Sequence, residues 1–142
     1  MQKIIDNNKS FKVSFSGSIL GFEELDEFEL EIVKDTPFLY LRSLDNPEIS
    51  FVTTSPFEWY NTYSIHLEEQ LKTHLMIDDP EDVLVLSIVT IRDSLSTSTI
   101  NLLAPLIINL NERIGTQQVL QGGIYRANHP LIVQKHKERG EE

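Results

Sequence analysis

Cysteine is absent from the 142 residues of this chain. Its absence excludes disulfide bonds, thiol catalysis and cysteine metal sites, and it agrees with a cytoplasmic protein, because disulfides are rare in the cytoplasm. Long apolar segments are absent as well. Because no run of about 18 apolar residues occurs, the sequence predicts no membrane-spanning helix. The first residues, Met1–Asp6, lack the apolar core of a signal peptide. We therefore predict a cytoplasmic protein that does not bind a membrane.

The sequence also lacks the motifs of common catalytic and metal sites. No G-x-S-x-G, G-x-G-x-x-G or G-K-[ST] pattern occurs. His66 and His74 are eight residues apart, which is not the spacing of a helical zinc motif. Residues 78–82 lack the alternating acids and central glycine of a calcium loop. Asp45 and Glu48 are neighbouring carboxylates, but the sequence sets no distance between them. We predict that the protein is not an enzyme and uses no metal or cofactor.

Basic residues are few relative to acidic ones, and the net charge is −10. Residues 1–99 carry 18 Asp and Glu but 7 Lys and Arg, whereas residues 100–142 carry 4 acids and 5 bases. An acidic body repels phosphates, which argues against direct binding of nucleic acid. It suits a partner with a basic face. The simpler alternative is that the charge only keeps the protein soluble.

Short strands dominate the apolar pattern that is present. Residues 11–15 and 28–32 alternate apolar and polar side chains, as half-buried strands do. Residues 38–44 and 49–54 flank an Asp-Asn-Pro-Glu turn, which predicts an antiparallel hairpin. The β-branched run 83–91 predicts a central strand, and residues 117–121 predict a further one. Leucine recurs every four residues within 65–76, which predicts a helix.

These elements predict a mainly β fold. We expect a single compact antiparallel β-barrel-like domain over residues 1–133, with one or two short helices. Residues 134–142 mix charges without an apolar anchor, so we predict a charged, disordered tail there.

The stretch 98–109, STINLLAPLIIN, is the most informative part of the chain. Its aliphatic side chains favour a strand, and Pro105 cannot donate to a strand ladder, so the strand is expected at a sheet edge or at a bulge. A free edge would offer a set of candidate partner-binding residues: Asn101, Leu103, Pro105, Ile107 and Asn109. The alternative is that the chain's own C-terminal segment covers this edge while the asparagines cap turns. The sequence leaves both interpretations open.

Three aromatic residues lie close together at Phe57, Trp59 and Tyr60. Such a cluster forms a binding patch or closes one end of the core, and in a small domain the second role is the more common. We keep Phe57, together with Asp45 in the hairpin turn, as further candidate contacts with a partner.

Several stretches in series resemble the FliW flagellar assembly factor family. The matching pieces are Leu20–Glu23, Pro37–Leu41, Ser43–Asp45 with Pro47-Glu48, Phe51-Val52, Pro56-Phe57, 83–91, Thr99–Asn109, Gln118–Leu120, Tyr125 and His129–Leu131. They occur in the family's order, and the N-L-x-A-P block that begins at Asn101 is the most specific. Residues 15–21 depart from the family's proline-containing approach, and Asn128 stands where the family usually has arginine.

The resemblance implies a cytoplasmic, non-enzymatic protein with a small β-barrel-like fold. Members of the family bind flagellin and the RNA-binding translational regulator CsrA. When flagellin accumulates, it takes the factor away from CsrA, and the freed regulator represses flagellin translation. The resemblance thus implies a partner switch in which this protein antagonises CsrA while it is free of flagellin. The alternatives are a flagellin chaperone without a regulatory role and a barrel that binds a small molecule.

Overall fold

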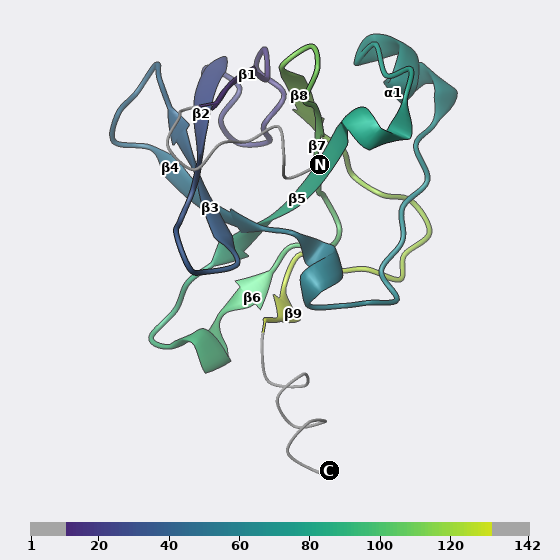
Figure 1. Cartoon of the computed structure of the whole chain (residues 1–142). Coiled ribbons are helices and arrows are strands. Elements are labelled where there is room, and N and C mark those ends of the chain that lie inside the picture. The colour runs from purple at the N-terminus through teal and green to yellow at the C-terminus, as the bar shows by residue number, and fades with distance from the viewer. Residues whose placement is uncertain (1–10, 132–142) are drawn as a thin grey trace.

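The computed structural model describes residues 11–131, and their strands curl into a barrel with one α-helix at its side (Figure 1). The strands are β1 (Phe11–Ser14), β2 (Glu27–Ile32), β3 (Phe38–Ser43), β4 (Ser50–Thr54), β5 (Val83–Thr90), β6 (Thr99–Ile100), β7 (Leu106–Asn109), β8 (Ile114–Gln117) and β9 (His129–Pro130). The helix is α1 (Glu69–His74), and the 3₁₀ turns are η2 (Pro56–Glu58), η3 (Pro80–Asp82) and η4 (Leu95–Thr97).

Seven strands close the barrel in the order β4-β3-β2-β1-β8-β7-β5, and β5 pairs back onto β4. All neighbours in this ring are antiparallel except β1 and β8, which run parallel through Ser14 and Ile114. The two short strands β6 and β9 extend from one end of β5 and lie below the barrel (Figure 1). The predicted mainly β, barrel-like fold is confirmed, with this one parallel closure as the difference.

The barrel is filled by the apolar side chains that alternate along its strands. Phe11 and Val13 of β1 and Phe28 and Leu30 of β2 are all buried. The rings of Phe28 and Phe15 meet edge to face with centroids 5.5 Å apart. Gly115 in β8 makes room for this packing, because a Cβ there would lie 2.9 Å from the Phe15 ring. Alternating apolar residues therefore fill the barrel with side chains, as expected for a small barrel.

The predicted hairpin of β3 and β4 and the central position of β5 are confirmed, since β5 pairs with β4, β6 and β7. Two predicted elements differ. The helix spans only Glu69–His74, because Ile65 and Leu67 alternate with the exposed His66 and Glu68 in extended chain. The strand predicted at 117–121 lies earlier in the chain: β8 spans Ile114–Gln117, and residues 118–121 are irregular. The amides of Gln118 and Leu120 nevertheless form backbone hydrogen bonds. The predictions for Met1–Asp6, for the domain limit at 133 and for the tail at 134–142 lie outside the described residues.

Candidate functional site

The stretch around Pro105 is divided between two strands. β6 ends at Ile100 and β7 begins at Leu106, so Pro105 lies just before the ladder and removes no hydrogen bond from it. β7 pairs with β5 on one side and β8 on the other. The prediction of an edge strand is therefore wrong: all four residues of β7 are buried in the barrel wall.

A later segment of the chain covers the part that precedes β7. The amide of Leu120 donates to the Leu103 carbonyl at 2.8 Å, and the amide of Gln118 donates to the Pro105 carbonyl at 2.9 Å. Asn101 Oδ1 accepts hydrogen bonds from two backbone amides that follow it, those of Leu103 and Ala104, both at 3.0 Å. This is the covered-edge alternative, in which an asparagine caps a turn. The side chains of Asn101 and Leu103 remain partly exposed.

Asn109 joins α1 to the turn between β7 and β8. Its Nδ2 donates to the carbonyls of Leu75 at 2.7 Å and Met76 at 3.0 Å. Its Oδ1 accepts from the amides of Asn111 and Glu112 at 2.9 and 3.1 Å. The Asn109 side chain is 1% exposed, so its polar atoms are engaged inside the protein.

Ile107 is fully buried and packs in one cluster with Leu71 and Leu75 of the α1 region. Pro105 is buried as well. Pro105, Ile107 and Asn109 were predicted to offer their side chains to a partner. The structure contradicts the accessibility that this prediction requires, because each of the three side chains lies in the interior.

Asp45 is an exposed residue with a structural contact. Its Oδ2 accepts from the backbone amides of Asp26 at 2.7 Å and Glu27 at 3.1 Å. These hydrogen bonds lower the pKa of Asp45, because they favour its charged form. The carboxylate thus ties the β3–β4 turn to the start of β2.

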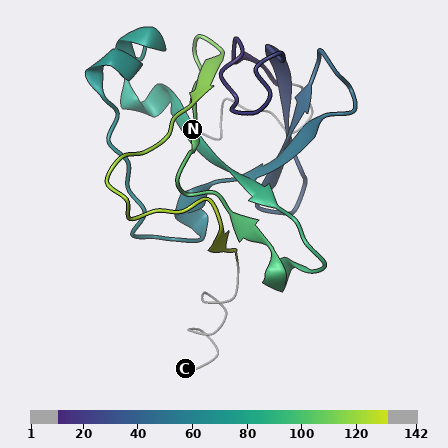
Figure 2. The same ribbon diagram turned by 180° about the vertical axis from the view of Figure 1, so that it is seen from behind.

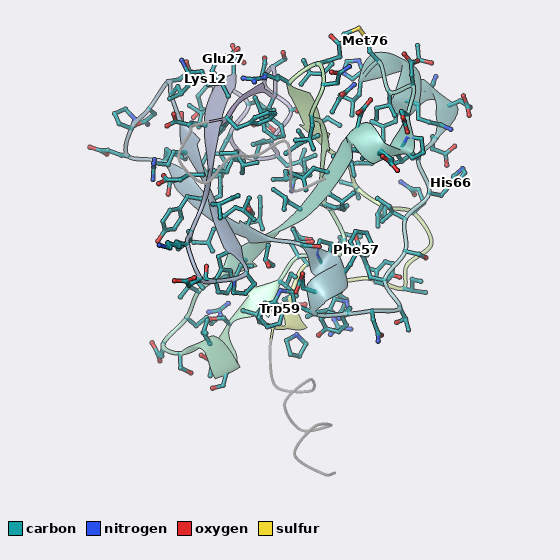
Figure 3. All side chains as sticks on the ribbon, viewed as in Figure 1. Lys12, Glu27, Phe57, Trp59, His66 and Met76 are labelled. Atoms are coloured by element: carbon teal, nitrogen blue, oxygen red, sulfur yellow. The ribbon has the colours of Figure 1, made fainter. Side chains whose placement is uncertain are left out.

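The aromatic cluster closes the lower end of the core and leaves one ring partly outside. The Tyr63 hydroxyl donates to the Leu102 carbonyl at 2.9 Å, and burial raises the pKa of Tyr63. Its ring lies 4.7 Å from that of Tyr125 and 5.7 Å from that of Phe57, centroid to centroid. Phe57 is 44% exposed. Figure 3 shows Phe57 and Trp59 near each other at the η2 turn, at the lower end of the barrel. Phe57 is thus the most accessible apolar side chain among the predicted candidates.

Two grooves that sequence analysis missed flank the irregular segment 64–68. The first, which we call the α1 groove, has a volume of about 810 Å³. Its apolar lining comprises Ile65, Leu67, Met76 and Ile77, and its acidic lining comprises Glu69, Asp78 and Glu112, beside His66, Lys72, Thr73 and Pro80. Figure 3 places Met76 at the top of the α1 region and His66 at its side. The α1 groove therefore combines an apolar surface with carboxylates.

The second groove, of about 350 Å³, runs between residues 64–71 and residues 118–125. These two segments lie side by side in both views (Figure 1, Figure 2). Val119 and Ile124 line it and are 40% and 72% exposed. No sequence pattern marks either groove, because each is formed by segments that are brought together by the barrel.

Within residues 11–131, no group of three or more His, Asp or Glu side chains is placed to hold a metal ion. No helix in that range has the length and apolar composition needed to cross a bilayer.

Comparison with known proteins gives a consistent match. The sequence profile described as FliW protein matches residues 2–131. A flagellar assembly factor FliW from Clostridium botulinum is 40% identical over 121 residues, which cover 84% of this chain and 85% of the relative. One from Clostridium novyi is 38% identical over 130 residues and one from Geobacillus is 36% identical over 131, each covering 91% or more of both chains.

The fold matches a solved structure too. A crystal structure of the flagellar assembly factor FliW superposes with a TM-score of 0.81 at 35% identity and covers 88% of each chain. The profile, the relatives and the superposed structure agree over nearly the whole described barrel. The chain therefore belongs to the FliW protein family.

Proposed function

We propose that this protein is a cytoplasmic flagellar assembly factor that binds flagellin and the translational regulator CsrA. Free of flagellin, it holds CsrA and antagonises its binding to RNA. Bound to flagellin, it releases CsrA, which then represses flagellin translation. Support comes from the relatives named flagellar assembly factor FliW, and from the acidic net charge of the chain, which suits a basic partner.

The observation that carries this proposal is the one-sided charge of the chain. The net charge is −10 and the excess of acids lies within residues 1–99. An RNA-binding regulator presents lysine and arginine to phosphates. An acidic protein docked beside that surface lowers its positive potential and repels RNA, even where it does not cover the RNA site. The proposed antagonism is therefore electrostatic and requires no catalytic group.

A three-component binding experiment tests the proposal. Purified CsrA and this protein are expected to co-elute from a size-exclusion column, and added flagellin is expected to move CsrA to its own elution volume. RNA bound to CsrA is expected to be released when this protein is added, and to rebind when flagellin follows. Flagellin binding without any complex with CsrA would leave only the chaperone role, and binding to neither protein would overturn the proposal.

Among the residues singled out in the sequence, Phe57 has the geometry of a partner contact. Its ring is half-exposed and rests on Tyr63, whose hydroxyl is fixed to the backbone. A rigidly supported aromatic ring gives contact area at little cost in side-chain entropy. Asn101, Leu103 and Asp45 are also accessible, but the hydrogen bonds described above for these residues hold the chain's own backbone.

A further inference from the structure

Met76 occupies a position at which helices usually place glycine. The amide of Ile77 donates to the Lys72 carbonyl at 2.8 Å and the amide of Met76 donates to the Thr73 carbonyl at 3.1 Å. This pair of hydrogen bonds is a Schellman motif, and its left-handed residue is Met76, with a φ of 56°. A side chain in that conformation is strained because its Cβ approaches the following carbonyl. The turn itself therefore does not explain a methionine here.

Packing does not explain it either. Met76 is 53% exposed, whereas its neighbour Leu75 is buried in the cluster that holds α1 to the barrel. Asn109 keeps the Met76 carbonyl in place from inside the protein, so the backbone geometry is fixed. A strained residue that holds a flexible apolar side chain in solvent is a feature of binding surfaces.

The surroundings of Met76 are apolar and rigid. Ile65, Leu67 and Ile77 line the same α1 groove and are themselves packed against the cluster of Leu71, Leu75 and Ile107. Met76 thus extends an apolar surface whose other members are anchored in the core. A groove with a fixed apolar lining suits the apolar face of a partner segment.

The charged side chains that line the α1 groove are mostly acidic. Asp78 and Glu112 line it, and neither forms an ion pair with another described residue. Glu69 also lines it and holds Lys72 at 3.0 Å, which partly offsets the positive charge of that lysine. An occupant with its own lysines and arginines would therefore complement the groove, and an acidic one would be repelled.

We propose that the α1 groove docks a basic amphipathic peptide segment of a protein partner, with Met76 inserted among the partner's apolar side chains and Asp78 and Glu112 facing its cations. This inference deepens the proposed function and rests on it, since CsrA is the basic partner there. It assigns to that partner a surface distinct from the exposed ring of Phe57.

The first experiment substitutes Met76→Gly. Glycine relieves the strain of the left-handed position, so the unfolding temperature is expected to rise or stay unchanged. Removal of the apolar side chain is expected to weaken CsrA binding about tenfold, measured by titration calorimetry. A variant that is at least as stable yet binds more weakly cannot owe its defect to misfolding.

The second experiment reverses charge at two matched pairs of sites. The groove variant carries Asp78→Lys with Glu112→Lys, and the control carries Glu24→Lys with Glu48→Lys, at exposed acids outside the groove. Both variants change the net charge by the same amount. The groove variant is expected to bind CsrA at least tenfold more weakly than the control at low salt. This difference in affinity is expected to decrease as the salt concentration rises.

Three outcomes overturn the inference, and they can be told apart. Equal weakening by the two charge variants means that only net charge matters, and the proposed function then survives without the groove. Wild-type affinity in both Met76→Gly and the groove variant places CsrA elsewhere on the surface. Failure of the wild-type protein to bind CsrA at all removes the proposed function together with the groove.

Discussion

The side-chain amide of Asn109 lies 2.7 Å from the carbonyl oxygen of Leu75, so a residue in the barrel wall holds the C-terminal end of α1. The two residues are 34 positions apart, so the contact cannot be recognised from the local sequence. The contact fixes the wall of the α1 groove, since the adjacent Met76 carbonyl is bound by the same amide.

Substitution of Asn109→Ala is expected to destabilise the protein by about 2–4 kcal/mol, because it leaves buried backbone groups at both ends of the contact without partners. Urea denaturation followed by circular dichroism measures the change. Asn101→Ala is the matched control: Asn101 caps a partly exposed turn, so the loss there should stay near 1 kcal/mol. Equal losses at the two sites would contradict the role given to Asn109.

Removal of a buried hydroxyl in β5 is not expected to destabilise the protein, in contrast to Asn109→Ala. Ser87 Oγ is buried without a hydrogen-bond partner among the described residues. Ser87→Ala removes this unsatisfied group and is expected to leave the free energy of unfolding unchanged or to raise it by up to about 1 kcal/mol. On the neighbouring strand, the hydroxyl of the buried Thr53 donates to the Leu39 carbonyl at 3.0 Å. Thr53→Val should therefore destabilise by about 1 kcal/mol, and the reverse ranking would show that Ser87 has a partner.

Protonation of His129 is expected to make the free energy of unfolding depend on pH. Its Nε2 accepts a hydrogen bond from the Arg126 amide at 2.9 Å, which requires the unprotonated nitrogen. Burial, and secondarily the charge of Arg126, lower the pKa of His129 below its ordinary value of 6.5. The unfolded chain therefore takes up a proton first as pH falls, and stability declines from about pH 6.5 down to the lower pKa of the folded state. Chemical denaturation at several pH values should show a smaller decline in His129→Asn than in the wild type. Identical profiles would exclude His129 as the source.

Substitution of Phe57 is expected to affect partner binding more than the stability of the fold. Phe57→Ala is expected to reduce stability by less than about 1 kcal/mol, because nearly half of the side chain is already in solvent. The same substitution is expected to weaken flagellin binding about tenfold. CsrA binding, which we assign to the α1 groove, is expected to stay unchanged, because Phe57 does not line that groove. Calorimetric titration of both partners identifies which of them uses it. Unchanged affinity for both would return Phe57 to a purely structural role.

The sequence predicts the parts of this fold that depend on local patterns. Alternation in 28–32 and the Asp-Asn-Pro-Glu turn gave the β2 strand and the β3–β4 hairpin, because side-chain period and turn chemistry are local properties. Local patterns could not decide between a free and a covered environment for the stretch around Pro105. Its covering segment binds through the backbone of Gln118 and Leu120, and backbone hydrogen bonds carry no residue signature.

The same reasoning explains the candidate residues. Asn101 and Asn109 are polar residues in an apolar stretch, which marks them in the sequence. An asparagine side chain serves a turn or a helix end as well as it serves a partner, so the pattern does not tell these roles apart. Met76 gave no signal, because its left-handed backbone and its exposure become visible only in three dimensions.

The salt dependence of the affinity between this protein and purified CsrA tests the central claim most directly. If the acidic body acts by electrostatics, the affinity measured by titration calorimetry should fall steadily as ionic strength rises from about 0.05 M to about 0.5 M, as the Debye length shortens. An affinity that stays constant over that range would contradict the account.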